Sequence, residues 1–198
     1  MDDPEELPVA GTVVLVRPGA TGIEVLLMRR PGRGSFAGAW VFPGGKVEAV
    51  DRMSGASEVE DARRAGIRET YEEVGLEVAG LRDLSCWTPP AGIPRRIRTW
   101  FFIARAPGGD VRAATDEVVE HAWIAPAHAL ERHAAGDWLL FPPTWMTLHG
   151  LQGAEDVDAA LAAAGDARRF ATTIEGKAFC WEGMRLETQK LPWTLAVE

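Results

Sequence analysis

The chain has 198 residues, 46% of them hydrophobic, which is enough to build the core of one domain with an added segment. Its formal net charge of −8 argues against a nucleic-acid partner, because phosphate backbones are held mainly by clustered lysine and arginine. The chain has two cysteines without a CxxC pair and no apolar run of transmembrane length, so we expect a reduced, cytoplasmic protein with no membrane contact.

The strand pattern dominates the first two thirds of the chain. Two apolar, β-rich runs at residues 9–16 and 23–28 flank a Pro/Gly turn and predict a hairpin, preceded by a frayed tail over residues 1–6. Further strands are expected at residues 39–42, 78–87, 98–105 and 121–124.

Four segments have the apolar spacing typical of helices. Ser57 opens a predicted helix, because Glu60 completes a capping-box pattern and apolar residues recur at helical spacing up to Gly75. Later helices are expected at 127–136, 144–151 and 157–164, and a small terminal hairpin at 170–197. This order favours an α+β fold or an α/β/α sandwich with a mixed sheet, a central helix and a helical C-terminal elaboration. We expect a single domain, with its core at about 8–150 and the elaboration at 151–198.

Three carboxylates stand on one face of the central helix. Glu69, Glu72 and Glu73 are spaced i, i+3 and i+4, and like charges at these spacings cost about 0.2 to 0.5 kcal/mol per pair. A bound cation would remove this cost, and oxygen ligands on a rigid helix suit Mg²⁺ or Mn²⁺, which often bridge to phosphates. Taken alone, the pattern is also compatible with a solvated acidic face.

Gly45, Glu60 and the run from Arg68 to Leu76 together resemble the Nudix box, G-x5-E-x7-R-E-U-x-E-E-x-G-U, where U is apolar. Thr70 occupies a normally apolar position. Fourteen residues, 46–59, lie between Gly45 and Glu60 where the family pattern has five. The Nudix branch that includes peroxisomal coenzyme A diphosphatases has a similar long loop, and here the matching residues are Phe42-Pro43-Gly44-Gly45 and Asp51-Arg52.

The resemblance implies roles for individual residues. The ligands of one or more Mg²⁺ or Mn²⁺ ions would be Glu69, Glu72, Glu73 and the main-chain carbonyl of Gly44. Arg68 would orient the carboxylates. The general base would be Glu69 or Glu73, with Glu117 as the candidate outside the box. Gly45, Glu60 and Gly75 would have structural roles in the motif.

Arginine suits bidentate phosphate binding, so basic clusters are candidates for substrate contacts. These candidates are Arg29, Arg30 and Arg33 before the strand at 39–42, and a second group, Arg95, Arg96 and Arg98, from which we include Arg98. Each could equally be a solvated arginine beside a loop. Most of the eight tryptophans are expected in the core, although Trp87, Trp100 or Trp123 could flank a base.

The resemblance implies metal-dependent hydrolysis of a diphosphate linkage in a nucleoside diphosphate derivative, with coenzyme A or an acyl-CoA as the first substrate to test. ADP-ribose or a dinucleotide polyphosphate is the alternative substrate. A nucleotide-sensing module that does not cleave its ligand is the alternative from another class. The sequence leaves open whether residues 165–198 pair with a second subunit, as in a homodimer, or fold over the cleft.

Overall fold

The computed structural model describes residues 7–33 and 36–197, so the tail expected at residues 1–6 lies outside the described part. Strands β1 (Val9–Pro18) and β2 (Ile23–Arg29) form the predicted hairpin, with Val16 opposite Val25. The turn between them contains Gly22 with a φ of 68°, a left-handed conformation that glycine adopts without strain.

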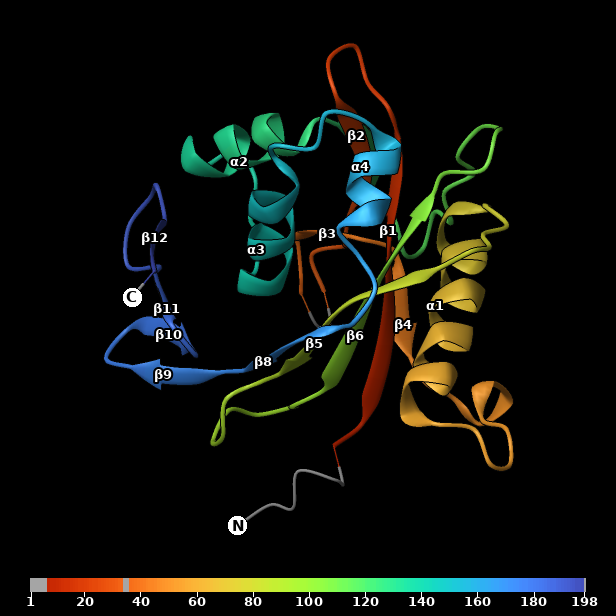
Figure 1. Ribbon diagram of the computed structural model, residues 1–198, viewed down its shortest axis with the longest axis horizontal. Coiled ribbons are helices and arrows are strands. Elements are labelled where there is room, and N and C mark those ends of the chain that lie inside the picture. Colours follow the sequence, from red (N-terminus) through yellow and green to blue (C-terminus); the bar gives the residue numbers. More distant parts are fainter. Residues whose placement is uncertain (1–6, 34–35, 198) are drawn as a thin grey trace.

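A mixed eight-stranded sheet lies at the centre of the fold (Figure 1). Its order is β3-β2-β1-β6-β5-β8, with β4 paired to β1 and β7 paired to β2. The pairs β1·β6 and β5·β8 are parallel and the others are antiparallel. The remaining strands are β3 (Trp40–Val41), β4 (Gly44–Lys46), β5 (Arg82–Thr88), β6 (Arg98–Arg105), β7 (Glu120–Ile124) and β8 (Arg168–Ala171).

Helices cover both faces of this sheet. Helix α1 (Glu58–Val74) lies on one side, and α2 (Pro126–Ala134), α3 (Pro142–Leu151) and α4 (Val157–Ala162) lie on the other (Figure 1). Strand β1 separates two buried clusters, because Val13 and Leu15 pack with α1 whereas Val14 and Val16 pack with α3 and α4. The predicted α+β fold with an α/β/α sandwich is confirmed.

Helix α1 lies directly on strand β1. Gly11 has no side chain here, and a Cβ atom at this position would overlap the backbone of Ala62 and Gly66 in the helix. Thr70 is fully buried at the position where the motif is normally apolar, and its hydroxyl donates to the carbonyl of Gly66 at 2.7 Å. This internal hydrogen bond satisfies the hydroxyl, so that threonine can occupy an apolar position.

The predicted terminal hairpin is wrong in extent. Residues after α4 form β8 and then a separate four-stranded antiparallel sheet, ordered β12-β11-β10-β9. Its strands are β9 (Thr173–Glu175), β10 (Ala178–Trp181), β11 (Met184–Glu187) and β12 (Thr194–Val197). Gly176 and Gly183, with φ values of 64° and 67°, reverse the chain between these short runs. The helical part of the elaboration therefore ends at α4.

The terminal sheet packs away from α1. Phe170, Trp181 and Leu186 belong to the buried cluster that contains α3, on the face of the main sheet opposite α1. The strand expected from residue 78 begins only at Arg82, because Val78 and Leu81 are buried without joining the ladder. Among the described residues, no helix is long and apolar enough to cross a membrane.

Candidate active site

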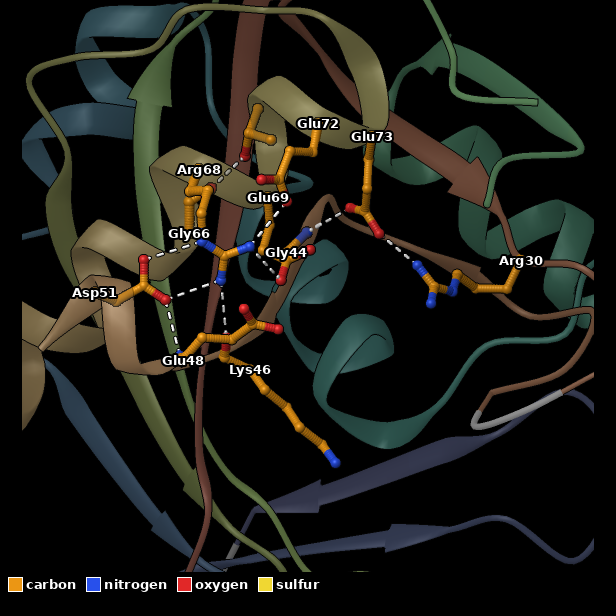
Figure 2. Close-up of polar contacts among 11 residues, drawn as sticks. Arg30, Gly44, Lys46, Glu48, Asp51, Gly66, Arg68, Glu69, Glu72 and Glu73 are labelled. Atoms are coloured by element: carbon orange, nitrogen blue, oxygen red, sulfur yellow. Dashed lines mark hydrogen bonds and ion pairs between the residues drawn. The ribbon is translucent and has the colours of Figure 1, made fainter. Parts of the chain in front are cut away.

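The last two turns of helix α1 carry the carboxylates that the sequence singled out (Figure 2). Ser57 and Glu60 begin the helix: the Ser57 amide and hydroxyl both donate to the Glu60 carboxylate at 2.8 Å. These hydrogen bonds lower the pKa of Glu60. Gly75 ends the helix in the left-handed conformation, with a φ of 69°. Glu60 and Gly75 thus lie at the two ends of the helix, and their structural role in the motif stays a prediction.

Arg68 connects the carboxylates of α1 to Asp51 in the long loop before this helix (Figure 2). Its Nη1 atom donates to Glu69 Oε1 at 2.9 Å and to Glu72 Oε2 at 2.8 Å. On its other side, Nε and Nη2 donate to the two oxygens of Asp51 at 3.0 and 2.8 Å. One guanidinium thereby binds three carboxylates, and the orienting role expected for Arg68 stays a prediction that these contacts permit.

Asp51 is a site residue whose role sequence reasoning missed. It ends the short helix η1 (Ala49–Asp51) in the long loop before α1, and it is only 3% exposed. Burial alone would raise the pKa of Asp51, but hydrogen bonds from Arg68 and from the Glu48 amide outweigh burial and lower it. The same hydrogen bonding raises the pKa of Arg68. The Asp-Arg pair in the loop was visible in the sequence, but not the residue to which Asp51 binds.

Glu73 is the buried carboxylate of the site, with 1% of its side chain exposed. Its Oε2 accepts a hydrogen bond from the Gly44 amide at 2.9 Å, and its Oε1 forms an ion pair with Arg30. Burial raises the pKa of Glu73 to about 7; Gly44 and Arg30 pull it down, whereas the nearby charges of Glu69 and Glu117 add to the increase. Burial likewise raises the pKa of Glu69.

The two glycines before the long loop lie against the carboxylates. Gly44 has a φ of 151°, and a side chain there would overlap the backbone of Gly11. A Cβ atom at Gly45 would overlap the carboxylate of Glu69. Because neither glycine has a side chain, β4 can lie directly beside both Glu69 and Glu73. The structural role expected for Gly45 stays a prediction, which this lack of space supports.

Glu117 reaches the same place from a distant loop. The loop is fastened to the end of α1 by hydrogen bonds of 2.9 Å from the Ala114 amide to the Glu73 carbonyl and from the Arg112 amide to the Val74 carbonyl. Carboxylate oxygens of Glu69, Glu73 and Glu117 all lie within 4.8 Å of one another. Glu117, the candidate base outside the Nudix-like motif, therefore lies beside two carboxylates of that motif.

These three carboxylates fit a divalent cation. Their donors are all oxygen, which suits hard ions such as Mg²⁺ and Mn²⁺, and their mutual repulsion would be relieved by a positive charge. Glu72 is not part of this group among the described residues: its carboxylate binds Arg68 and is 52% exposed. Gly44 contacts the group through its amide, which donates to Glu73.

Arg29, Arg30 and Arg33, which were predicted to form one cluster, have different surroundings. Arg30 lies on Glu73, and Arg29 forms an ion pair with Glu120 at 3.3 Å. Arg33 is exposed in the loop between β2 and β3.

Arg98 does not belong with that group. It forms an ion pair with Glu58 at 2.7 Å, and Glu58 begins α1 whereas Glu73 lies at its end. A rise of about 1.5 Å per residue separates these two glutamates by roughly 22 Å, so Arg98 lies at the opposite end of α1 from Arg30, and its contact with substrate stays a prediction.

The tryptophans considered for base stacking are unsuited to it. Trp87 and Trp100 are 4% and 6% exposed and belong to the core. Trp123 is partly buried and lies under the guanidinium of Arg17, 4.3 Å from the ring centroid. An aromatic contact with a substrate therefore has to come from another residue.

The fold and the site together define an α/β/α sandwich whose central helix ends in a candidate divalent-metal centre. A family model described as the NUDIX domain matches residues 7–142. The chain belongs to the NUDIX domain family.

Individual relatives agree with this assignment. A Caenorhabditis elegans protein whose name places it with the nudix hydrolases is 26% identical, over 68% of this chain and 57% of its own length. The chain thus spans less than two thirds of that relative.

Solved structures show the same fold. A NUDIX hydrolase from Alicyclobacillus acidocaldarius matches with a TM-score of 0.73 and 23% identity, covering 81% of this chain and 97% of the other. A MutT NUDIX hydrolase from Burkholderia pseudomallei matches with a TM-score of 0.54 and 25% identity, over 73% and 97%. The NUDIX domain of Shewanella oneidensis NrtR, solved with ADP ribose, matches with 0.52 and 18% identity, over 69% and 89%.

Proposed function

We propose that this protein hydrolyses a diphosphate linkage in a nucleoside diphosphate derivative, with Mg²⁺ or Mn²⁺ as its cofactor. The observation that carries the proposal is the group of carboxylate oxygens from Glu69, Glu73 and Glu117, all within 4.8 Å of one another. Such a group is unfavourable without a cation and suited to one that also binds phosphate oxygens. Membership of the NUDIX domain family supports the same reaction class.

The surroundings of each side chain indicate its proposed role in metal or substrate binding. Glu69 and Glu73, the two less exposed carboxylates, would hold the cation, with Glu72 and the carbonyl of Gly44 as further ligands. The bound metal supplies charge neutralisation and lowers the pKa of water. Arg68 keeps Glu69 and Glu72 in position. Arg30 is held by Glu73, and the exposed Arg33 is the candidate of this group for a substrate phosphate.

Glu117 is the best placed residue to accept the proton from the attacking water. It is exposed, unlike Glu69 and Glu73, and it approaches the box from a separate loop. Of the three carboxylates, Glu117 would contact a water held by the cation while Glu69 and Glu73 contact the cation itself, so we assign Glu117 as the general base in place of the two box residues.

Coenzyme A or an acyl-CoA is the first substrate to test. The long loop before α1 and the run Phe42-Pro43-Gly44-Gly45 resemble the coenzyme A branch, and the ordered Asp51 supports a defined role for that loop. ADP-ribose is the second candidate, since the NUDIX domain of NrtR, a fold neighbour, was solved with this ligand.

A turnover assay with added Mg²⁺ or Mn²⁺ tests the proposal. The substrates are coenzyme A, ADP-ribose and a dinucleotide polyphosphate, and the products are identified by mass. We expect cleavage of a diphosphate linkage that EDTA abolishes and that Glu73→Gln nearly abolishes in a folded protein. Tight nucleotide binding without any product would instead indicate a sensing module, and wild-type turnover by Glu73→Gln would refute the assignment of the metal site.

A further inference from the structure

Three of the exposed large apolar side chains come from different segments that border strands β2 and β3 near Arg30. Phe36, Val119 and Leu139 are 50%, 54% and 49% exposed. They belong to the loop between β2 and β3, the loop before β7, and the segment between α2 and α3, respectively. We refer to these three residues as the apolar rim.

Main-chain hydrogen bonds hold the segments of the apolar rim together. The amide of Val119 donates to the carbonyl of Arg29 at 3.0 Å, and the amide of Trp40 donates to the carbonyl of Leu139 at 2.9 Å. The loop that contains Phe36 is closed by a 2.9 Å hydrogen bond from the Arg30 amide to the Ala39 carbonyl. The segment of Val119 thus borders one edge of β2 and that of Leu139 the outer edge of β3, with the loop of Phe36 joining these two strands beside Arg30, whose side chain lies on Glu73 (Figure 2).

Phe36 is held in place although half of it is exposed. Its ring makes an edge-to-face contact with Phe141, with centroids 4.9 Å apart and an interplanar angle of 87°. Its φ of 60° is a left-handed conformation that is strained for a residue with a side chain. Strained residues of this kind are found preferentially at ligand-binding positions, because a functional contact can offset the cost.

Charge beside the apolar rim is complementary to a phosphorylated ligand. Arg33 is in the same loop as Phe36, is exposed, and has no ion pair with any residue in the described ranges 7–33 and 36–197. Arg30 lies on the other side, at the buried carboxylate. Because Arg33 lies three residues before Phe36, a ligand whose phosphate contacts Arg33 would have its apolar end within reach of the Phe36 ring.

From this arrangement we propose that Phe36 binds the base of the nucleoside diphosphate substrate with its ring stacked on the base, and that Val119 and Leu139 extend the apolar surface on either side of β2 and β3. The inference rests on the proposed function and adds the part of the substrate that the metal centre does not contact. A ring whose orientation is fixed by a second ring is preorganised for stacking on a flat partner. An aliphatic chain would need apolar area but no fixed ring.

Equilibrium binding of AMP, measured by calorimetry, tests this assignment without any turnover. AMP carries a base but no diphosphate linkage, and ribose 5-phosphate serves as the matched ligand without a base. In Phe36→Leu, which keeps an apolar side chain but loses the ring, we expect AMP to bind about tenfold more weakly. Phe36→Trp keeps a ring and is expected to bind AMP within about twofold of wild type.

Ile174→Ala is the control, since Ile174 is similarly exposed but lies in the terminal sheet, and its AMP affinity should not change. Ribose 5-phosphate should bind equally to all variants. Wild-type affinity of Phe36→Leu for AMP would overturn the assignment, as would equal affinity of the wild-type protein for AMP and ribose 5-phosphate. Because no turnover is needed, Phe36-dependent binding in a protein that hydrolyses no diphosphate would refute the proposed function alone.

Discussion

Protonation of Glu73 should control the stability of the metal-free protein. The pKa of Glu73 rises from 4.5 to about 7 on folding, mainly because the carboxyl is buried. The folded state thus binds this proton more tightly than the unfolded chain does. The resulting stabilisation is fully present below pH 4.5 and is lost as the pH rises through about 7. At about 1.4 kcal/mol per pKa unit, the loss between pH 5 and pH 8 amounts to about 2.5 kcal/mol.

Thermal unfolding in EDTA measures this effect. In a chain of this length about 2.5 kcal/mol corresponds to a fall in Tm of about 5 to 10 °C. Glu73→Gln mimics the protonated side chain and should lack this part of the pH dependence, whereas Glu72→Gln, at an exposed position, should retain it. Saturating Mg²⁺ at pH 8 should restore stability to the wild-type protein by binding the folded state. Parallel loss of Tm in wild type and Glu73→Gln would refute the reasoning.

Three further substitutions test the site. Asp51→Asn removes the charge that holds Arg68, so Mg²⁺ affinity or kcat should fall about 10- to 100-fold, whereas Asp110→Asn at an exposed position should leave both unchanged. Glu117→Gln should lower kcat about 100-fold or more with the Mg²⁺ activation constant unchanged, and a weakened metal affinity instead would make Glu117 a ligand. Gly45→Ala places a methyl group in the Glu69 carboxylate and should weaken Mg²⁺ activation, unlike a substitution to alanine at Gly165, where the added Cβ meets no neighbour.

Local signals in the sequence were enough to predict the carboxylate helix. A capping box at Ser57 and a glycine stop at Gly75 are short-range features, and the structure places the helix ends at these residues. The metal-binding face follows from them, because the i, i+3 and i+4 spacing is fixed once the helix forms. The proximity of Glu117 was suggested only by resemblance, since no local pattern connects it to the helix.

Features that depend on pairing between distant parts of the chain could not be predicted from the sequence. Strand β4 has the sequence Gly44-Gly45-Lys46, which carries no strand propensity, and it forms because β1 pairs with it at close range. The ion pair between Asp51 and Arg68 spans a loop whose path no periodicity predicts. In the terminal sheet, Gly176 and Gly183 did signal turns, but the number of strands depends on which short runs pair.

Because Gly11 has no side chain, the helix that carries the carboxylates lies directly against strand β1. Main chain rests on main chain where Ala62 and Gly66 approach it, so at this point no side chain separates the helix from the sheet. A shift of the helix along the strand is restricted there, whereas the surrounding loops carry Arg33 and Glu117 at exposed positions. Those loops can diverge in sequence and alter the choice of ligand while the spacing of the cation-binding oxygens stays the same.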